Sequence, residues 1–284
     1  MKDSVKEKSG QFANILLDRW FRRTFGMRRS KRLLTLLLTE LIPEHDIVDI
    51  DYGPHEFTNV FEDDKDVRVD VECTDRDGTR FVVEMQVTRQ ASFHERSIYN
   101  STFAVQEQLE RGSTCFDFPT VYFIGIMDFS LHEGSDQVLY RYHLTERNSG
   151  EIMSSRLQYI FLELPNCSKA LTPEATVLDN FCYALHNIAS LEEEPEGLDG
   201  DIFRLLFNSA KISNFTPQEK AKYDYDMTTE RDRINQLLYA KEEGMAQGKA
   251  QQAAETARKM LKKGMHKDTI SELTGLSKEQ IDAL

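Results

Sequence analysis

The chain has 284 residues, of which 40% are hydrophobic and 29% are charged, and its formal net charge is −13. This is the composition of a globular protein, and it excludes wholesale disorder. The first ten residues lack the apolar core of a signal peptide, and no apolar run is long enough to span a bilayer. We therefore expect a cytoplasmic protein without a membrane partner.

Basic residues are concentrated near the N-terminus. Residues 19–32 contain seven cations and no acid, whereas acids crowd into residues 62–66 and 192–201. A negative net charge opposes nucleic-acid binding by the surface as a whole, but one basic face on an acidic body would permit it. Two interpretations stay open. The cations contact a DNA backbone, with Arg22, Arg28 and Lys31 as candidates, or they lie on solvated helix faces and pair with the acidic segment.

The spacing of apolar residues predicts helices in the first three quarters of the chain. They are expected at residues 12–25, 30–42, 93–110, 174–190 and 201–210. Ser30 is the expected N-cap of the second helix, Pro43 its stop, and Gly112 the end of the third.

Strands are expected at residues 67–73, 80–88, 120–127 and 157–164, with Asp77-Gly78 as the turn between the first two. The first two alternate apolar and polar side chains, and the third is uniformly apolar, as a central strand would be. The order of helices and strands predicts an α/β fold, with a mixed sheet flanked by helices.

The composition changes near Thr228 to residues that favour helix, so we expect a domain of residues 1–227 followed by an all-α tail, 228–284. The last residues predict two short helices, the first capped by Asp268 and ended by Gly275, the second opened by a capping box of Ser277 and Gln280. This is a helix-turn-helix shape. Its second helix offers few cations, which favours assembly, including a homo-oligomer, or regulation over sequence reading.

The length of the hairpin turn decides which side chains share a face. A two-residue turn at Asp77-Gly78 would mix apolar and polar residues on both faces. A three-residue turn, 76–78, with Gly78 in the left-handed region, makes one face wholly apolar. It pairs Val71 with Val83 and Cys73 with Phe81, and, further along, Val67 with Val87 and Val69 with Met85.

In that register the opposite face pairs Asp70 with Glu84, and Arg68 with Gln86. Two carboxylates placed directly opposite repel each other unless something neutralises them. Mg²⁺ prefers such hard oxygen ligands and suits phosphodiester hydrolysis. The main-chain carbonyl of Met85 could also ligate the ion, and the Gln86 amide could orient a water. The alternative is that these carboxylates form the solvated face of an edge hairpin.

The sequence resembles the Rpn family of recombination-promoting nucleases, also called PD-(D/E)XK nuclease family transposases. The resemblance is carried by DRWFRRTFG, by Asp70 followed by DGTRFVVEMQV, by FHERSIYNSTFAVQEQLERG leading into PTVYFIGIMDF, by YIFLELP, and by KEEGMAQGKA, ARKMLKKG and ISELTGLSKEQIDAL. It covers nearly the whole chain. It implies a restriction-endonuclease-like core and a metal-dependent DNA endonuclease that promotes recombination or horizontal gene transfer.

Carried over by position, Asp70 and Glu84 become metal ligands for Mg²⁺, with Mn²⁺ or Ca²⁺ as substitutes, and Gln86 takes the place of the lysine of the general motif. Arg96, Tyr99 and Gln108 match family-typical positions. Arg96 is expected to contact phosphate, whereas helix packing is the favoured role of the other two. Glu40 is a candidate third carboxylate, although Leu38-Thr39 stands where the family usually has Leu-Asn.

Two functions from different classes remain. The first is the nuclease just described, with DNA contacted mainly through its backbone. The second is a catalytically degenerate module of a mobile or defence element that binds DNA or protein. The acidic net charge and the neutral amide of Gln86 support the second, and the hairpin together with the resemblance favours the first.

Overall fold

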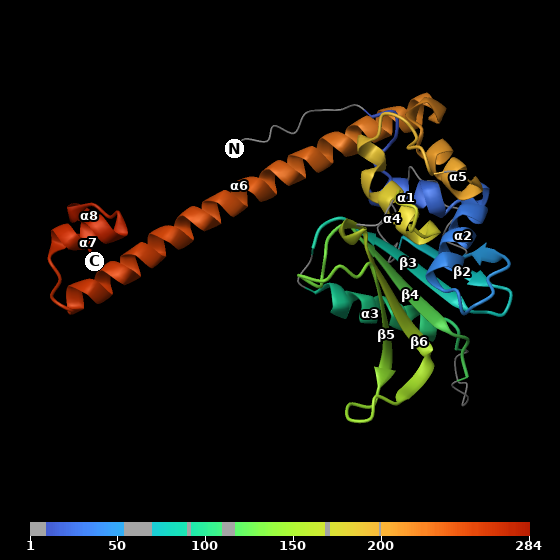
Figure 1. Cartoon of the computed structure of the whole chain (residues 1–284), viewed down its shortest axis with the longest axis horizontal. Coiled ribbons are helices and arrows are strands. Elements are labelled where there is room, and N and C mark those ends of the chain that lie inside the picture. The colour runs from blue at the N-terminus through green and yellow to red at the C-terminus, as the bar shows by residue number, and fades with distance from the viewer. Residues whose placement is uncertain (1–9, 54–69, 90–91, 110–116, 168–170, 199) are drawn as a thin grey trace. The chain divides into compact units, whose positions relative to one another are not determined.

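The computed structural model describes residues 10–53, 70–89, 92–109, 117–167, 171–198 and 200–284. It forms two compact units, residues 1–215 and 216–284 (Figure 1). The first unit carries a mixed sheet with helices on both faces, and the second is entirely helical in its described part. The predicted fold class is confirmed.

The sheet has six strands in the order β1-β2-β3-β4-β6-β5. They are β1 (Ile50–Tyr52), β2 (Val71–Asp75), β3 (Arg80–Gln86), β4 (Val121–Met127), β5 (Leu139–Thr145) and β6 (Ile152–Glu163). β3, β4 and β6 run parallel, and the other neighbours are antiparallel. Sequence patterning missed β1 because it is short, and β5 because it is a largely exposed edge strand without a buried apolar run.

The hairpin has the predicted register, with Val71 opposite Val83 and Cys73 opposite Phe81. Its turn is the predicted three-residue one. Asp75 N–H donates to Thr79 O at 3.0 Å, and Gly78 has a φ of 83°. Only glycine adopts this conformation without strain, so the turn residue fixes the pairing of the strands. The predicted pairs that involve Val67, Arg68 and Val69 lie outside the described residues.

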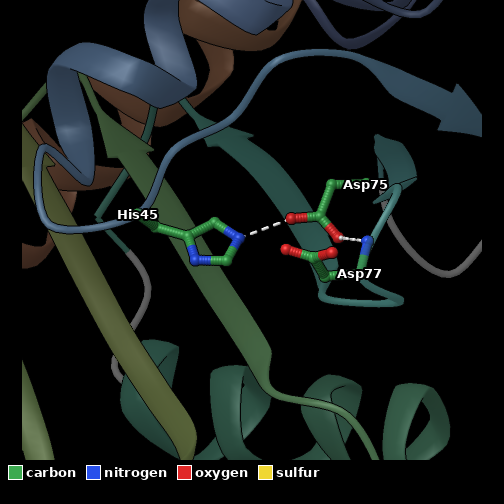
Figure 2. A group of neighbouring side chains, drawn as sticks. All are labelled: His45, Asp75 and Asp77. Atoms are coloured by element: carbon green, nitrogen blue, oxygen red, sulfur yellow. Dashed lines mark hydrogen bonds and ion pairs between the residues drawn. The ribbon is translucent and has the colours of Figure 1, made fainter.

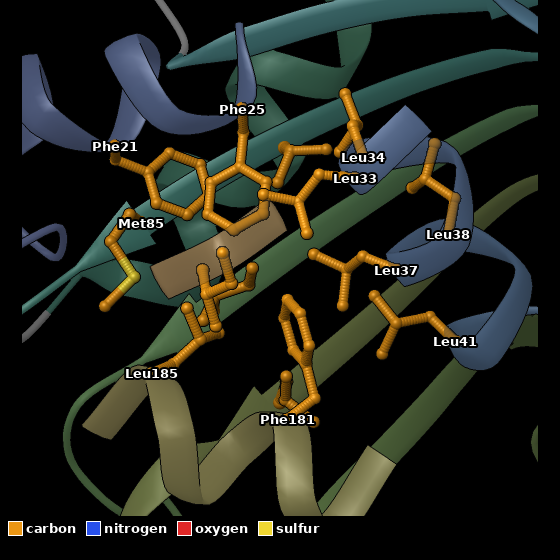
Figure 3. Close-up of a cluster of buried hydrophobic side chains, with 14 of the residues drawn as sticks. Phe21, Phe25, Leu33, Leu34, Leu37, Leu38, Leu41, Met85, Phe181 and Leu185 are labelled. Carbon is orange, nitrogen blue, oxygen red and sulfur yellow. The ribbon is translucent and has the colours of Figure 1, made fainter. Parts of the chain in front are cut away.

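One face of the sheet is covered by α1 (Asp18–Phe25), α2 (Lys31–Leu41), α4 (Val177–Asn187) and α5 (Asp201–Ala210). Figure 3 shows leucines of α2 and phenylalanines of α1 and α4 meeting Met85 of β3 in this core. The other face carries α3 (Phe93–Gln106), whose Phe93 packs with Phe123 and Phe161. The hairpin therefore has two covered faces, and β1 shields its β2 side.

The first predicted helix is shorter than expected. Helix α1 begins at Asp18, not at residue 12. Phe12 instead forms a β-bridge with Lys211, and Ala13 N–H donates to Ala210 O at 2.8 Å. Because these main-chain groups are paired with the end of α5, they are not available for a helix. The apolar residues that suggested a helix are buried nonetheless, since Ile15 and Leu16 join the core.

The second unit consists of α6 (Pro217–Lys262), α7 (Lys267–Thr274) and α8 (Lys278–Asp282). Helix α6 opens with a capping box of Thr216 and Glu219, so the change of composition at residue 228 falls inside a continuous helix. The unit has a small core of its own around Ala257, Ile270 and Ile281. Among the described residues, no helix is both long and apolar enough to cross a membrane.

The predicted details of the last two helices are mostly confirmed. Gly275 ends α7 with a φ of 73°, and Ser277 and Gln280 form the capping box of α8. The predicted cap by Asp268 is wrong. His266 occupies the N-cap position of α7, and Asp268 lies in the first turn, where its carboxylate pairs with Lys278.

Candidate active site

Asp70 and Glu84 are buried rather than on a solvated face, Glu84 beneath α3 and Asp70 beside Arg22 of α1. Their exposed fractions are 6% and 7%. Glu84 of β3 stands beside Gly125 of β4, where a Cβ atom would lie 2.8 Å from the Phe93 ring. The missing side chain therefore lets α3 approach the sheet closely next to Glu84. The alternative of a solvated edge hairpin is wrong for these two carboxylates.

Asp70 precedes β2 and turns its carboxylate toward β3. Its Oδ2 atom accepts a hydrogen bond from Met85 N–H at 2.6 Å, and Arg22 Nε of α1 lies 3.7 Å from Oδ1. Burial, reinforced by the negative charges of Asp18 and Glu84, raises the pKa of Asp70 to about 8, although the Met85 hydrogen bond and Arg22 oppose the shift. Without a further cation, this carboxyl group keeps its proton at neutral pH.

Glu84 is held from above by two side chains of α3. Asn100 Nδ2 donates to Oε2 at 3.0 Å, and Arg96 Nη2 forms an ion pair with Oε1. Burial raises the pKa of Glu84, while Arg96 and the Asn100 hydrogen bond act against the shift. The two carboxylates thus share a buried site in which each is less acidic than in water.

Gln86 continues the same face of β3. Its Oε1 accepts a hydrogen bond from Arg96 Nη2, and its Nε2 donates to Thr88 O at 3.0 Å. Asp128 N–H donates to Gln86 O, so the main-chain groups of Gln86 face β4. Because these groups alternate along a strand, the carbonyl of Met85 faces the other way, toward the side where Asp70 lies.

Two residues near the site were missed by sequence reasoning. Asn100 lies one turn after Arg96, so both reach Glu84 from one face of α3. Asp18 lies one turn before Arg22 on α1, and its charge acts on Asp70 and on Glu84. In both cases an i, i+4 spacing to a predicted residue was the signal that could have identified them.

Family models match both parts of the chain. The model of the PD-(D/E)XK nuclease family transposases matches residues 15–240, and that of the C-terminal HTH domain of the Rpn/YhgA-like nuclease family matches residues 250–284. The chain belongs to this nuclease family. No curated protein and no solved structure matches it. The resemblance to the Rpn family and the helix-turn-helix shape of the last residues are thereby confirmed.

The remaining predicted site residues lie away from the two buried carboxylates in the structure. No interaction among the described residues links Glu40 to Asp70 or Glu84, and Asp18 is the third acid near them. Gly78 lies in the turn. Tyr99 is 61% exposed and packs edge-on against Phe103, so it does not support the site. Gln108 follows the end of α3, and its Nε2 donates to Ala104 O of that helix at 2.8 Å, which is a local structural role.

The basic run of the nuclease does not form one continuous face. Arg23 is buried, with Nη1 donating to Ser209 O at 2.7 Å. Lys31 Nζ lies 2.9 Å from Asp49, and Arg32 pairs with Asp201 at 2.5 Å. The second of these pairs joins the basic run to the end of the acidic segment, as the alternative interpretation anticipated. Of the three predicted cations in the run, Arg22 has a described contact with one of the buried carboxylates, Asp70.

A second cluster of possible metal ligands lies at the turn of the hairpin. Figure 2 shows His45 and Asp75 facing each other beside Asp77, with candidate ligand atoms all within 4.8 Å of one another. His45 Nε2 contacts Asp75 Oδ2 at 2.5 Å, while Oδ1 accepts from Asp77 N–H and Thr79 N–H. These bonds already satisfy Asp75 as a cap of the turn. The turn ends where β3 begins, at Arg80, and Glu84 lies four residues further along the strand, about 13 Å away. The turn cluster and the buried pair of carboxylates are therefore separate sites.

Proposed function

We propose that this nuclease is a metal-dependent DNA endonuclease that hydrolyses phosphodiester bonds. The observation that carries the proposal is the burial of Asp70 and Glu84 near enough for their charges to interact, with raised pKa values. A site of this kind stabilises a divalent cation, because the cation neutralises both carboxylates.

The residues fit a hard cation. Asp70, Glu84 and the main-chain carbonyl of Met85 would hold Mg²⁺, or Mn²⁺ or Ca²⁺ in its place, through oxygen ligands alone. When bound, such an ion lowers the pKa of a water and offsets the negative charge that develops on phosphate. Asp18, one turn from Arg22, adds negative charge from α1 and attracts the cation.

The chain supplies its own contacts for the DNA backbone. Arg22 and Arg96 are each about one-third exposed and lie beside the two carboxylates, so a phosphate that approaches the site meets both. Arg28 is exposed on the turn after α1 and extends this surface. Lys31 is already paired with Asp49 and Asp51, and we assign it a smaller part. The C-terminal HTH domain supports DNA binding by the second unit.

The test is nicking of supercoiled plasmid by purified protein with Mg²⁺ or Mn²⁺. We expect the wild type to nick and the Asp70→Ala variant to be inactive. Asp77→Asn, which alters the turn cluster, is the matched control and should remain active. Equal nicking by wild type and Asp70→Ala, or no nicking with any of several divalent metals, would contradict the proposal.

We also propose a role in recombination or horizontal gene transfer, which the match to a family of nuclease-type transposases supports. We expect recombinant frequencies in cells that express the protein to fall when Glu84 is replaced by alanine. A wild-type frequency with Glu84→Ala would instead favour a degenerate regulatory module. The neutral amide at Gln86 and the net charge of −13 are the observations that favour this second candidate.

The C-terminal helices are also proposed to join two copies of the chain. Helix α6 leaves large apolar side chains exposed, namely Ile234, Leu237, Leu238, Tyr239 and Met245. Pairing of this stretch with a second copy would remove them from water. Light scattering should give a multiple of the chain mass for wild type and the monomer mass for Leu237→Glu/Leu238→Glu. An unchanged mass would count against assembly by this stretch.

A further inference from the structure

We propose that Gln86 is a positioning residue, and that the Arg96 guanidinium it holds is the fixed cation of the active site. This inference rests on the proposed nuclease function and assigns a phosphate-binding cation within it. It changes the expected role of Gln86, which is no longer to orient a water.

The hydrogen bonds of Gln86 support this assignment. Its Nε2 is tied to the main chain at Thr88 O, 3.0 Å away, so the plane of the amide is fixed by the segment that directly follows β3. The fixed amide presents Oε1 to α3, where Arg96 Nη2 donates to it. A neutral amide cannot take a proton from water, whereas its oxygen is a good acceptor for a guanidinium. The side chain is therefore used to hold Arg96.

Arg96 is held from several directions. The same Nη2 atom contacts both Gln86 Oε1 and Glu84 Oε1, and the guanidinium lies 5.9 Å from the centre of the Phe93 ring. Phe93 is itself anchored against Gly125 of the sheet. Because a guanidinium stays charged at any physiological pH, this arrangement keeps a positive charge beside Glu84 permanently. The other arginine near the carboxylates, Arg22, makes a longer contact, since its Nε lies 3.7 Å from Asp70 Oδ1.

This geometry accounts for the departure from the general motif, in which a lysine stands at the position of Gln86. In this chain the positive charge comes from α3 and the β3 residue keeps it in place. The Arg96 side chain is 31% exposed, so it can also reach a non-bridging oxygen of a phosphodiester bound over Glu84. The planar guanidinium suits two such oxygens at once. Arg96 is then a catalytic residue by contact, and Gln86 acts only through it.

A double-mutant cycle tests whether Gln86 acts through Arg96. Gln86→Leu should reduce kcat about tenfold or more with little change in KM for DNA, and Arg96→Ala should reduce it about a hundredfold or more. In the Arg96→Ala background, Gln86→Leu should cause no further loss, because the group it holds is gone. If the two losses multiply instead, Gln86 acts on the reaction independently, and the proposal is overturned.

Moving the positive charge from position 96 to position 86 can be followed by the Tm of the protein, a measurement that does not depend on activity. Arg96→Ala leaves Glu84 buried without its cation, so the Tm of the metal-free protein should fall. Adding Gln86→Lys should restore most of that loss and raise plasmid nicking at least about tenfold above Arg96→Ala, since the lysine places a charge at the same point. Arg89→Ala, which removes an arginine from an exposed pair with Glu133, is the control and should leave the Tm unchanged.

The outcomes separate this inference from the proposed function. If the wild type does not nick DNA under any condition, the proposed function fails, yet the recovery of Tm by Gln86→Lys still decides where the cation belongs. If the wild type nicks and the double variant recovers neither Tm nor activity, the assignment of Arg96 as the fixed cation is overturned. Should Arg96→Ala fail to fold, Arg96→Gln removes the charge with a smaller loss of side-chain volume, and the same cycle is run with it.

Discussion

Both ends of the β2–β3 hairpin carry carboxylates, but the surroundings of these carboxylates differ. At the turn, Asp75 accepts hydrogen bonds from two main-chain N–H groups and contacts His45. At the other end, Asp70 receives one main-chain hydrogen bond and is buried close to the charges of Asp18 and Glu84. The first carboxylate is satisfied by the fold, and the second is left in need of positive charge.

If the buried pair is the metal site, as we propose, then proximity of ligand atoms alone does not identify a metal site in this fold. The turn cluster has the tighter grouping of candidate ligands, yet its geometry is explained by the turn. The buried pair, Asp70 and Glu84, forms no such close group of ligand atoms among the described residues, yet burying these carboxylates costs free energy that a cation would offset.

Cleavage should show the largest contrast. Asp70→Ala and Glu84→Ala should each lower the rate of plasmid nicking more than about a hundredfold, because each removes a proposed ligand of the metal. Asp77→Asn at the turn should change it by no more than about twofold, the range expected of an exposed substitution. Rates measured at saturating Mg²⁺ decide the point, and a large loss with Asp77→Asn would reverse the comparison.

Metal affinity should likewise depend on the buried pair and not on the turn cluster. Calorimetric titration with Mn²⁺ should give one site, weakened at least about a hundredfold by Asp70→Asn and unchanged by His45→Gln. Because Asp70 must lose its proton to bind, the affinity should rise about tenfold per pH unit up to the folded pKa of about 8 and then level. An affinity independent of pH between 6 and 8 would argue against Asp70 as a ligand.

The stability of the metal-free protein should depend on pH in a direction fixed by Asp70. Its folded pKa of about 8 lies above the ordinary 3.8, so folding favours the protonated form. This contribution is fully present below pH 4 and is lost as pH rises toward 8. Asp70→Asn should therefore gain stability relative to wild type with rising pH, by about 5 kcal/mol at pH 8, because each unit of pKa difference corresponds to about 1.4 kcal/mol. Urea unfolding in EDTA at several pH values measures this, and a constant difference would contradict it.

The smallest effect belongs to the turn itself. Gly78→Ala should destabilise the protein by about 1–2 kcal/mol, because φ is +83° and the new Cβ would lie 3.2 Å from Pro119 Cγ. Gly134→Ala is the matched control, since its φ of +82° has nothing within 4 Å of the added atom. Thermal unfolding should show the larger loss for Gly78→Ala. An equal loss would mean that the Pro119 contact relaxes freely.

The sequence predicted the hairpin register well, because alternation of apolar residues and the Asp77-Gly78 turn both constrain it. It predicted Asp70 and Glu84 as a pair for the same reason. It could not show that α3 covers Glu84, since that depends on Gly125 and on packing between residues far apart in the chain. Nor could it identify Asp18 in place of Glu40 as the third acid near the pair, because the approach of α1 to the sheet is set by tertiary contacts.

Crystals soaked in Mn²⁺ offer the most direct test of the central claim, that the buried pair and not the turn cluster is the metal site. Anomalous difference maps should show a peak between Asp70 and Glu84, within ligand distance of the Met85 carbonyl, in wild-type crystals and none there in Asp70→Asn crystals. A peak between His45, Asp75 and Asp77 with no peak at Asp70 would contradict the account.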